Sequence, residues 1–201
     1  MEEGLTARLV AAEDEAWAGA RDGQRSSTLD HVIRAAGVEP SGPAHDAAIE
    51  AYQAGWAPHT YTDPTVVGVL AELRARGLAL GLLSNTLWTR QYHEAVLARD
   101  GLAGAFDGLV FSSELDWTKP HAAAFMASVA SVGVDDPSAC VFVGDRLFDD
   151  VFGAQAVGMR AVHVPHSAIP EAQRGHTEGR PDAVISTLPD LLPVIDTWLA
   201  G

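Results

Sequence analysis

The alternation of strand-like and helix-like segments from about residue 60 onward limits the fold more than any other feature of this sequence. Short, continuous apolar runs such as LALGLLSN (residues 78–85) and ACVFVGD (residues 139–145) are typical of strands buried on both faces. Between such runs, apolar residues recur every three or four positions, as in amphipathic helices. This order predicts an α/β fold in which helices flank a parallel sheet. Further strands are expected at 108–115, 159–164 and 183–187, helices at 61–77, 88–101, 120–133, 149–158 and 188–199, and one long polar loop at 165–181.

The first part of the chain shows only helical periodicity. Residues 5–20, 28–37 and 45–56 have apolar side chains at three- to four-residue spacing, and we identify no strand among them. We therefore expect two domains, a small helical domain at residues 1–58 and an α/β domain at residues 59–201. A chain of 201 residues is long enough to bury a substantial core.

The composition disfavours several classes of function. A formal net charge of −14 argues against nucleic acid as a partner, because phosphate backbones require a basic surface, but it is compatible with a small phosphorylated ligand. No apolar run reaches the length of about 18 residues that a membrane-spanning helix needs, and the acidic, helix-like N-terminus does not resemble a signal peptide. The single cysteine, Cys140, cannot form an internal disulfide, which favours a reduced, cytoplasmic setting.

Polar side chains follow three of the predicted strands at the point where each strand ends. In an open parallel sheet, ligands bind at the carboxyl ends of the strands, so these side chains are expected to form one site. Lys119 is also the only lysine in the chain, and a compact ammonium that faces a fixed anion is not readily replaced by arginine. The strand-end residues are Ser84 and Asn85, then Lys119 after the next strand, then Asp145 with Asp149 and Asp150.

These residue types are complementary in phosphoryl-transfer chemistry. Clustered carboxylates repel one another and require a cation, and oxygen ligands suit Mg²⁺, which also binds substrate phosphate. A serine hydroxyl can donate a hydrogen bond to phosphoryl oxygens, and a lysine neutralises their charge. Taken singly, each group has a simpler explanation as a strand-end turn, an exposed lysine at a helix start or an acidic helix N-terminus. Together, at successive strand ends, they favour a site for a phosphorylated ligand.

The combination resembles the haloacid dehalogenase (HAD) superfamily of hydrolases over nearly the whole chain. The stretch LGLLSN resembles the second motif of that family, TKP the third, and VFVGDRLFDDVFGAQAVGMRAVHV the fourth. The helical residues 1–58 resemble the cap that many members insert after their first strand. The resemblance implies a Mg²⁺-dependent phosphatase acting on a small phosphorylated metabolite. It implies phosphoryl binding by Ser84 with Asn85, a catalytic role for Lys119 at the nucleophile and phosphoryl group, and Mg²⁺ ligation by Asp145 with Asp150 or, alternatively, Asp149.

The sequence departs from the family in its first motif, an apolar strand that ends in Asp-x-Asp and supplies the nucleophile. Nothing in MEEGLTARLVAAEDEAW matches it, because Asp14 lies in a polar helical stretch with no strand before it. In the family, this strand lies between those that carry the second and fourth motifs. Either these two strands pair directly, or another element fills the position, or a segment upstream of Met1 is absent from this chain, and we favour the third. An exposed central position would also favour a homo-oligomer.

Whether this chain is an active enzyme is therefore left open, with little or no phosphatase turnover expected. Two alternatives are retained. One is a protein without a nucleophile that binds Mg²⁺ and a phosphorylated ligand. The other is a 2-haloacid dehalogenase, which needs no metal, although the acidic GDRLFDD stretch would repel a carboxylate substrate.

Overall fold

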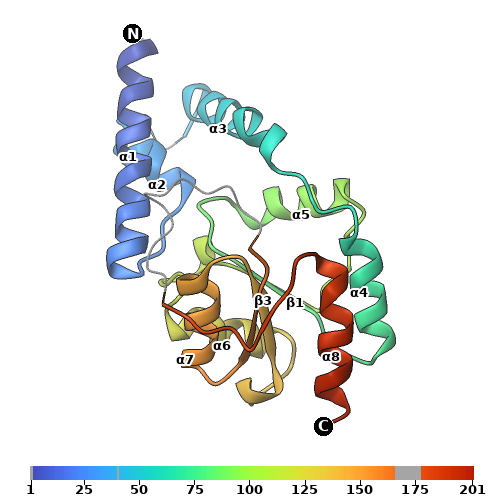
Figure 1. The fold of residues 1–201 in the computed structure, drawn as a ribbon. Coiled ribbons are helices and arrows are strands. Elements are labelled where there is room, and N and C mark those ends of the chain that lie inside the picture. The colour runs from blue at the N-terminus through green and yellow to red at the C-terminus, as the bar shows by residue number, and fades with distance from the viewer. Residues whose placement is uncertain (1, 40, 166–177) are drawn as a thin grey trace. The chain divides into compact units, whose positions relative to one another are not determined.

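We describe the fold from a computed structural model, which describes residues 2–39, 41–165 and 178–201 (Figure 1). Most of the predicted polar loop at 165–181 lies outside the described residues. The described chain forms two compact units, and each is treated by itself below. Unit 1 comprises residues 1–62, 84–100 and 111–118, and unit 2 comprises residues 63–83, 101–110 and 119–201.

Unit 1 is built on three N-terminal helices. Thr28 caps α2, where its hydroxyl accepts a hydrogen bond from the backbone N–H of His31, and Pro43 opens α3 at the first helical turn. The helices bury an aliphatic core between them, with Val32 and Ile33 almost fully inaccessible. The bounds are α1 Glu2–Gly23, α2 Leu29–Ala35 and α3 Pro43–Trp56, followed by a 3₁₀ turn, η1, at Ala57–His59. The core residues are Ala12, Leu29, Val32, Ile33, Ala36 and Leu87.

The strands form two small sheets. One sheet pairs β1 with β2, and the other has the parallel order β3-β4-β5. In the second sheet Val141 pairs with Arg160 and Gly144 with His163. The bounds are β1 Gly81–Ser84, β2 Gly108–Phe111, β3 Val141–Gly144, β4 Arg160–His163 and β5 Ala183–Val184.

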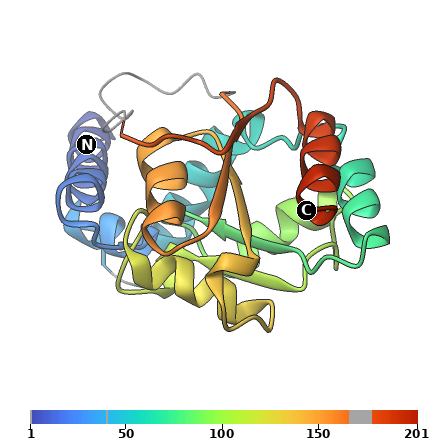
Figure 2. The same ribbon diagram turned by 60° about the horizontal axis from the view of Figure 1, so that its bottom comes forward.

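Helices cover the strands of unit 2. Figure 2 shows α4 beside α8 on one side of these strands and α6 with α7 on the other. The elements that complete the fold are α4 Val66–Ala75, α5 Arg90–Arg99, α6 Ala122–Ser131, α7 Gly153–Ala156 and α8 Leu191–Leu199, a π-helical turn η4 at Leu147–Phe152, and 3₁₀ turns η2 Ser112–Glu114, η3 Pro137–Ala139 and η6 Leu188–Asp190. The core of unit 2 consists of Val69, Leu73, Leu80, Val162, Val164, Ile185, Leu191 and Ile195.

The α/β fold with parallel strands flanked by helices is confirmed. The sheet differs from the prediction in one respect: among the described strands, β1 and β3 belong to different sheets. Direct pairing of these two strands, the first of the three arrangements considered above, is therefore excluded. Unit 1 combines the predicted helical domain with residues 84–100 and 111–118, so the division at 58/59 stays a prediction.

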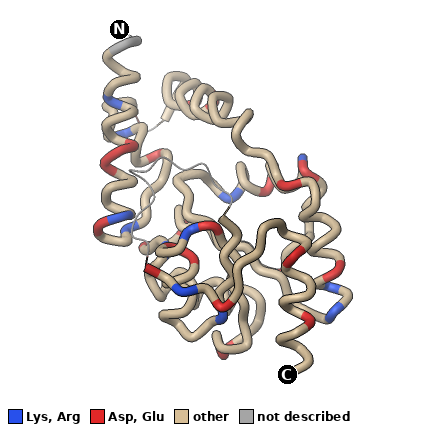
Figure 3. The backbone as a smooth tube through the Cα atoms, in the orientation of Figure 1, with Lys and Arg blue, Asp and Glu red and all other residues tan. Residues whose placement is uncertain are grey.

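The strong negative charge is spread over the chain. Acidic residues occur along the backbone of both units (Figure 3). In the part of the chain that the structure describes, no helix is long and apolar enough to cross a membrane.

Candidate active site

Unit 2 places Lys119 in contact with the acidic segment that follows β3. The Lys119 Nζ atom lies 2.6 Å from Asp150 Oδ1, and the two side chains are only 11% and 4% exposed. The ammonium group also lies 5.1 Å from the ring centroid of Phe142, in the middle of β3. Two groups 31 positions apart in the sequence thus form a buried ion pair at the end of this strand.

The turn after β3 holds Asp150 in position through the backbone. Asp150 Oδ2 accepts a hydrogen bond of 3.0 Å from the backbone N–H of Arg146, so each carboxylate oxygen has a protein partner. The π-helical turn η4 carries Asp150 back over Gly144, where a Cβ atom would collide with its carboxylate. The glycine in VFVGD is therefore required by the close approach of Asp150.

Asp149 forms an ion pair with Arg146 and not with Lys119. Its Oδ2 atom lies 3.1 Å from an Arg146 guanidinium nitrogen. Burial nevertheless raises the pKa of Asp149, and the hydrogen bond from Arg146 opposes this shift. Asp149 and Asp150 therefore have separate basic partners.

Asp145 follows β3 directly, and its side chain is partly buried. Burial, and next the charge of Asp150, raise the pKa of the Asp145 carboxyl group. No salt bridge to this carboxylate occurs among the residues that the structure describes. Its backbone carbonyl lies 3.1 Å from His163 Nε2, at the end of the neighbouring strand β4. A cation bound here would relieve the repulsion between Asp145 and Asp150.

The donor set is suited to Mg²⁺ in its chemistry. Mg²⁺ prefers oxygen ligands and is usually held by one or two carboxylates together with waters and substrate phosphate. Asp145, with Asp149 or Asp150 as the second carboxylate, fits this requirement. Within the described ranges no group of three or more His, Cys, Asp or Glu side chains is arranged to hold a metal ion.

Ser84 and Asn85 lie in unit 1, at the end of β1, and both are partly exposed. The residue that follows them, Thr86, is buried and fixed by Ser112: the Thr86 N–H donates to Ser112 Oγ (2.8 Å), which donates in turn to the Thr86 carbonyl (3.1 Å). The Thr86 hydroxyl oxygen also lies 2.8 Å from His93 Nε2. These contacts hold the loop that carries the predicted phosphate-binding residues.

Sequence reasoning identified Ser84, Lys119 and the aspartates but missed the supporting residues Ser112 and His93. Ser112 follows the last residue of β2, so the rule that singled out Ser84 could have found it. His93 lies in a helix and gives no comparable signal. The structure brings Lys119 and the three aspartates together in unit 2, whereas Ser84 and Asn85 lie in unit 1. The roles of all these residues in binding and catalysis stay predictions.

Comparison with known proteins identifies the family. A family model described as HAD-hydrolase-like matches residues 116–191. The glyceraldehyde 3-phosphate phosphatase of Methanopyrus kandleri is 30% identical over 167 residues, which cover 83% of this chain and 70% of that protein. The chain therefore belongs to the HAD-like hydrolases. It spans about half of two further relatives that it matches, 49% and 47% of their lengths.

Solved structures agree with this assignment. A 2-haloacid dehalogenase from Pseudomonas syringae pv. tomato DC3000 is 28% identical, with a TM-score of 0.63 over 98% of this chain and 81% of that one. A HAD phosphatase from Thermococcus onnurineus has a TM-score of 0.62 over 97% of this chain and 92% of that one. Its identity is 22%, so this second likeness concerns the fold alone.

Proposed function

We propose that this protein is a HAD-type, Mg²⁺-dependent phosphatase that acts on a small phosphorylated metabolite. The observation that carries the proposal is the buried Lys119–Asp150 pair beside Asp145. The family assignment and the phosphatase names of several relatives support it. Their names identify glyceraldehyde 3-phosphate and phosphoserine as substrates of those proteins, and substrates of this size and charge are the class that we propose here.

The proposed role of each residue follows from its charge and hydrogen-bonding groups. Lys119 would neutralise phosphoryl oxygens, and Ser84 and Asn85 would donate hydrogen bonds to them. Asp145, with Asp150 or Asp149, would hold Mg²⁺, which when bound supplies positive charge to the phosphoryl group. The backbone contacts around Asp150 keep the carboxylates oriented before a ligand arrives.

Because we identify no first motif in the sequence, we expect this chain to bind its ligand but to hydrolyse it slowly or not at all. The sequence contains no Asp-x-Asp strand that would form an aspartyl-phosphate, so this chain would bind Mg²⁺ and phosphate with little turnover. This feature favours, as a second candidate, a protein that binds a phosphorylated ligand without hydrolysing it. A 2-haloacid dehalogenase is less favoured, because the partly buried carboxylates Asp145 and Asp149 would repel a carboxylate substrate.

Thermal unfolding with Mg²⁺ and inorganic phosphate tests the proposed binding. Ligand at a hundredfold excess over Kd stabilises a protein by about 2.7 kcal/mol, which for this chain length raises Tm by several degrees. We expect this rise for the unaltered protein, its loss in chelator, and its loss in Asp145→Asn. Asp135→Asn is the control, because Asp135 is exposed in the same unit. The absence of any Tm rise with Mg²⁺ and phosphate together would contradict the proposal.

A further inference from the structure

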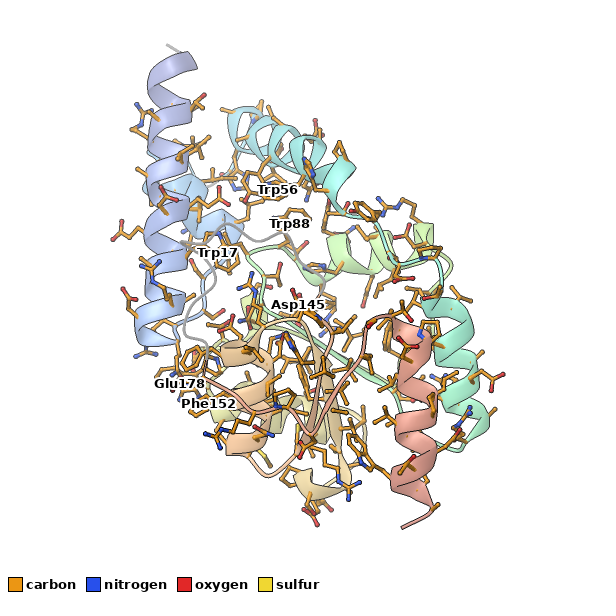
Figure 4. All side chains as sticks on the ribbon, viewed as in Figure 1. Trp17, Trp56, Trp88, Asp145, Phe152 and Glu178 are labelled. Carbon is orange, nitrogen blue, oxygen red and sulfur yellow. The ribbon has the colours of Figure 1, made fainter. Side chains whose placement is uncertain are left out.

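Unit 1 carries an aromatic cluster, defined here as Tyr52 and Trp56 of α3 with Trp88 of the loop before α5. The ring centroids are 6.4 Å apart for Tyr52–Trp56, 6.1 Å for Tyr52–Trp88 and 6.4 Å for Trp56–Trp88. The latter two pairs meet edge to face, at 84° and 67°. Figure 4 shows Trp56 and Trp88 near each other.

The cluster is only partly exposed: Tyr52 and Trp88 pack against the core of unit 1, whereas Trp56 is exposed. The buried core of unit 1 is aliphatic, whereas none of the three aromatic rings is buried. Trp56 is 44% exposed although it is the largest side chain of α3. Among the described residues of α3 only His45 is buried. An exposed indole beside two further aromatic rings offers apolar surface that a ligand can contact.

The polar edge of Tyr52 is hydrogen-bonded within unit 1. The Tyr52 hydroxyl donates a hydrogen bond of 2.7 Å to the Glu13 carboxylate. Burial, and next the hydrogen bond to this carboxylate, raise the pKa of Tyr52. The hydrogen bond ties the Tyr52 side chain of α3 to Glu13 of α1 within unit 1.

This geometry favours a flat ligand group over an ammonium ion. An aromatic cage for a quaternary ammonium needs space between its walls. The rings of the cluster instead contact one another directly, at centroid distances usual for packed aromatic pairs. The accessible indole of Trp56 can then accept a planar ring by stacking.

The same loop carries the predicted phosphate-binding residues. Trp88 follows Ser84 by four positions, a chain length that spans at most about 14 Å. Hydrogen bonds fix the residues between them: the Leu87 carbonyl accepts from the Leu29 N–H (2.6 Å), and the Trp88 N–H donates to the Thr86 hydroxyl (3.0 Å). Ser113 Oγ donates to the Trp88 carbonyl (2.6 Å). The phosphate-binding end of the loop and the aromatic cluster are thus held at a short, fixed separation.

We propose that the aromatic cluster binds the organic part of the substrate, and that this part carries an aromatic ring. The substrate class would be phosphate monoesters of ring-bearing alcohols, such as aryl alcohols or nucleosides. This inference rests on the proposed function, because it requires the phosphoryl group to bind at Ser84. It makes Trp56 a specificity-determining residue.

Calorimetric titration with matched pairs of ligands, in the presence of Mg²⁺, tests the inference. One pair is benzylphosphonate and methylphosphonate, and the other is adenosine 5′-monophosphate and ribose 5-phosphate. Stacking on an aromatic side chain is worth at least about a fivefold gain in affinity, so at least one ring-bearing ligand should bind that much more tightly than its ring-free partner.

Variants of the protein separate the contribution of the ligand's aromatic ring to the affinity from that of its phosphate. Trp56→Ala should remove the preference and leave the Kd of the ring-free ligand unchanged, whereas Trp56→Phe should retain most of it. Tyr61→Ala is the matched control, because Tyr61 lies in the same unit, is 81% exposed and is not part of the cluster. Equal affinities within both pairs, with the ring-free ligands still bound, would overturn this inference and leave the proposed function standing. Failure of all four ligands to bind would overturn both.

Discussion

At the scale of single residues, the site depends on Lys119. Its position could be predicted, because it is the only lysine and follows a predicted strand. The acidic segment that follows β3 was expected at the same site, but which of its aspartates pairs with Lys119 could not be predicted. Ser112, which contacts Thr86 from 26 positions away, was missed although it also follows the end of a strand. Sequence reasoning thus finds chemically unusual residues at strand ends but misses the side chains that orient them.

Lys119→Ala should destabilise the protein by about 3 kcal/mol, since removal of one partner of a buried pair leaves the other charge uncompensated. Adding Asp150→Asn to this variant should restore part of the loss, because the orphaned charge is then removed as well. Urea unfolding of both variants measures the difference. A loss below about 1 kcal/mol in the single variant would show that the pair behaves like an exposed one.

His93 should make unit 1 sensitive to acid. Burial lowers the pKa of His93, and the charge of Glu114 only partly opposes this shift. A histidine with a depressed pKa in the folded state contributes its full stability above its ordinary pKa of about 6.5, and this contribution is lost as the pH falls toward the folded pKa. The Tm should therefore drop less between pH 7.5 and 5.5 in His93→Gln than in the unaltered protein. His31→Gln, at an exposed position of the same unit, is the control, and an equal drop in all three proteins would refute the assignment.

At the scale of elements, the order of strands and helices could be predicted well and their ends less so. The segment 108–115 was expected to be one strand, but β2 ends at Phe111 and a 3₁₀ turn follows. The apolar run GLVF ends at the same residue, and the polar residues Ser112, Ser113 and Glu114 form the turn. Residues 149–158 were expected to form one ordinary helix, but a π-helical turn covers Leu147–Phe152 and only Gly153–Ala156 is α-helical. Six residues are too few to distinguish one helical period from another in the sequence.

Gly144→Ala tests how η4 positions Asp150. The added methyl group would meet the Asp150 side chain, so we expect a loss of about 1–3 kcal/mol together with weaker phosphate binding. The control is Gly68→Ala in the interior of α4, where a Cβ meets nothing within 4 Å and a gain of about 0.5–1 kcal/mol is expected. Urea unfolding and phosphate titration measure both effects. If the two substitutions change stability equally, Gly144 has no special role.

At the scale of the whole molecule, the chain has HAD-like architecture, and we identify no stretch of its sequence that resembles the first motif of the family. The described strands form two sheets where the sequence predicted one. Sequence patterns show which segments become strands, but pairing depends on which neighbours are present, and a single chain cannot reveal that from periodicity alone. The family, the α/β class and the acidic strand end were all predictable. Periodicity did not predict two sheets, although the separation of β1 from β3 is compatible with the unmatched first-motif strand that the family places between them.

The missing motif leads to a prediction about turnover. Phosphate monoesters should be hydrolysed little or not at all by this chain, even with saturating Mg²⁺, because no aspartate lies in the expected nucleophile position. A steady-state phosphate-release assay checks this. Strong Mg²⁺-dependent release that Lys119→Ala abolishes would instead require a different nucleophile in the chain.

The central claim is that Lys119 and the acidic segment after β3 form a binding site for Mg²⁺ and a phosphoryl group. Calorimetric titration of inorganic phosphate, with Mg²⁺ and with chelator, tests it most directly when the unaltered protein is compared with Lys119→Met. Methionine keeps much of the length of the lysine side chain and removes the charge. We expect phosphate to bind only in the presence of Mg²⁺, and at least about tenfold more weakly in Lys119→Met, the change produced by loss of about 1.4 kcal/mol. Equal phosphate affinity in the two proteins, or binding unaffected by chelator, would contradict the claim.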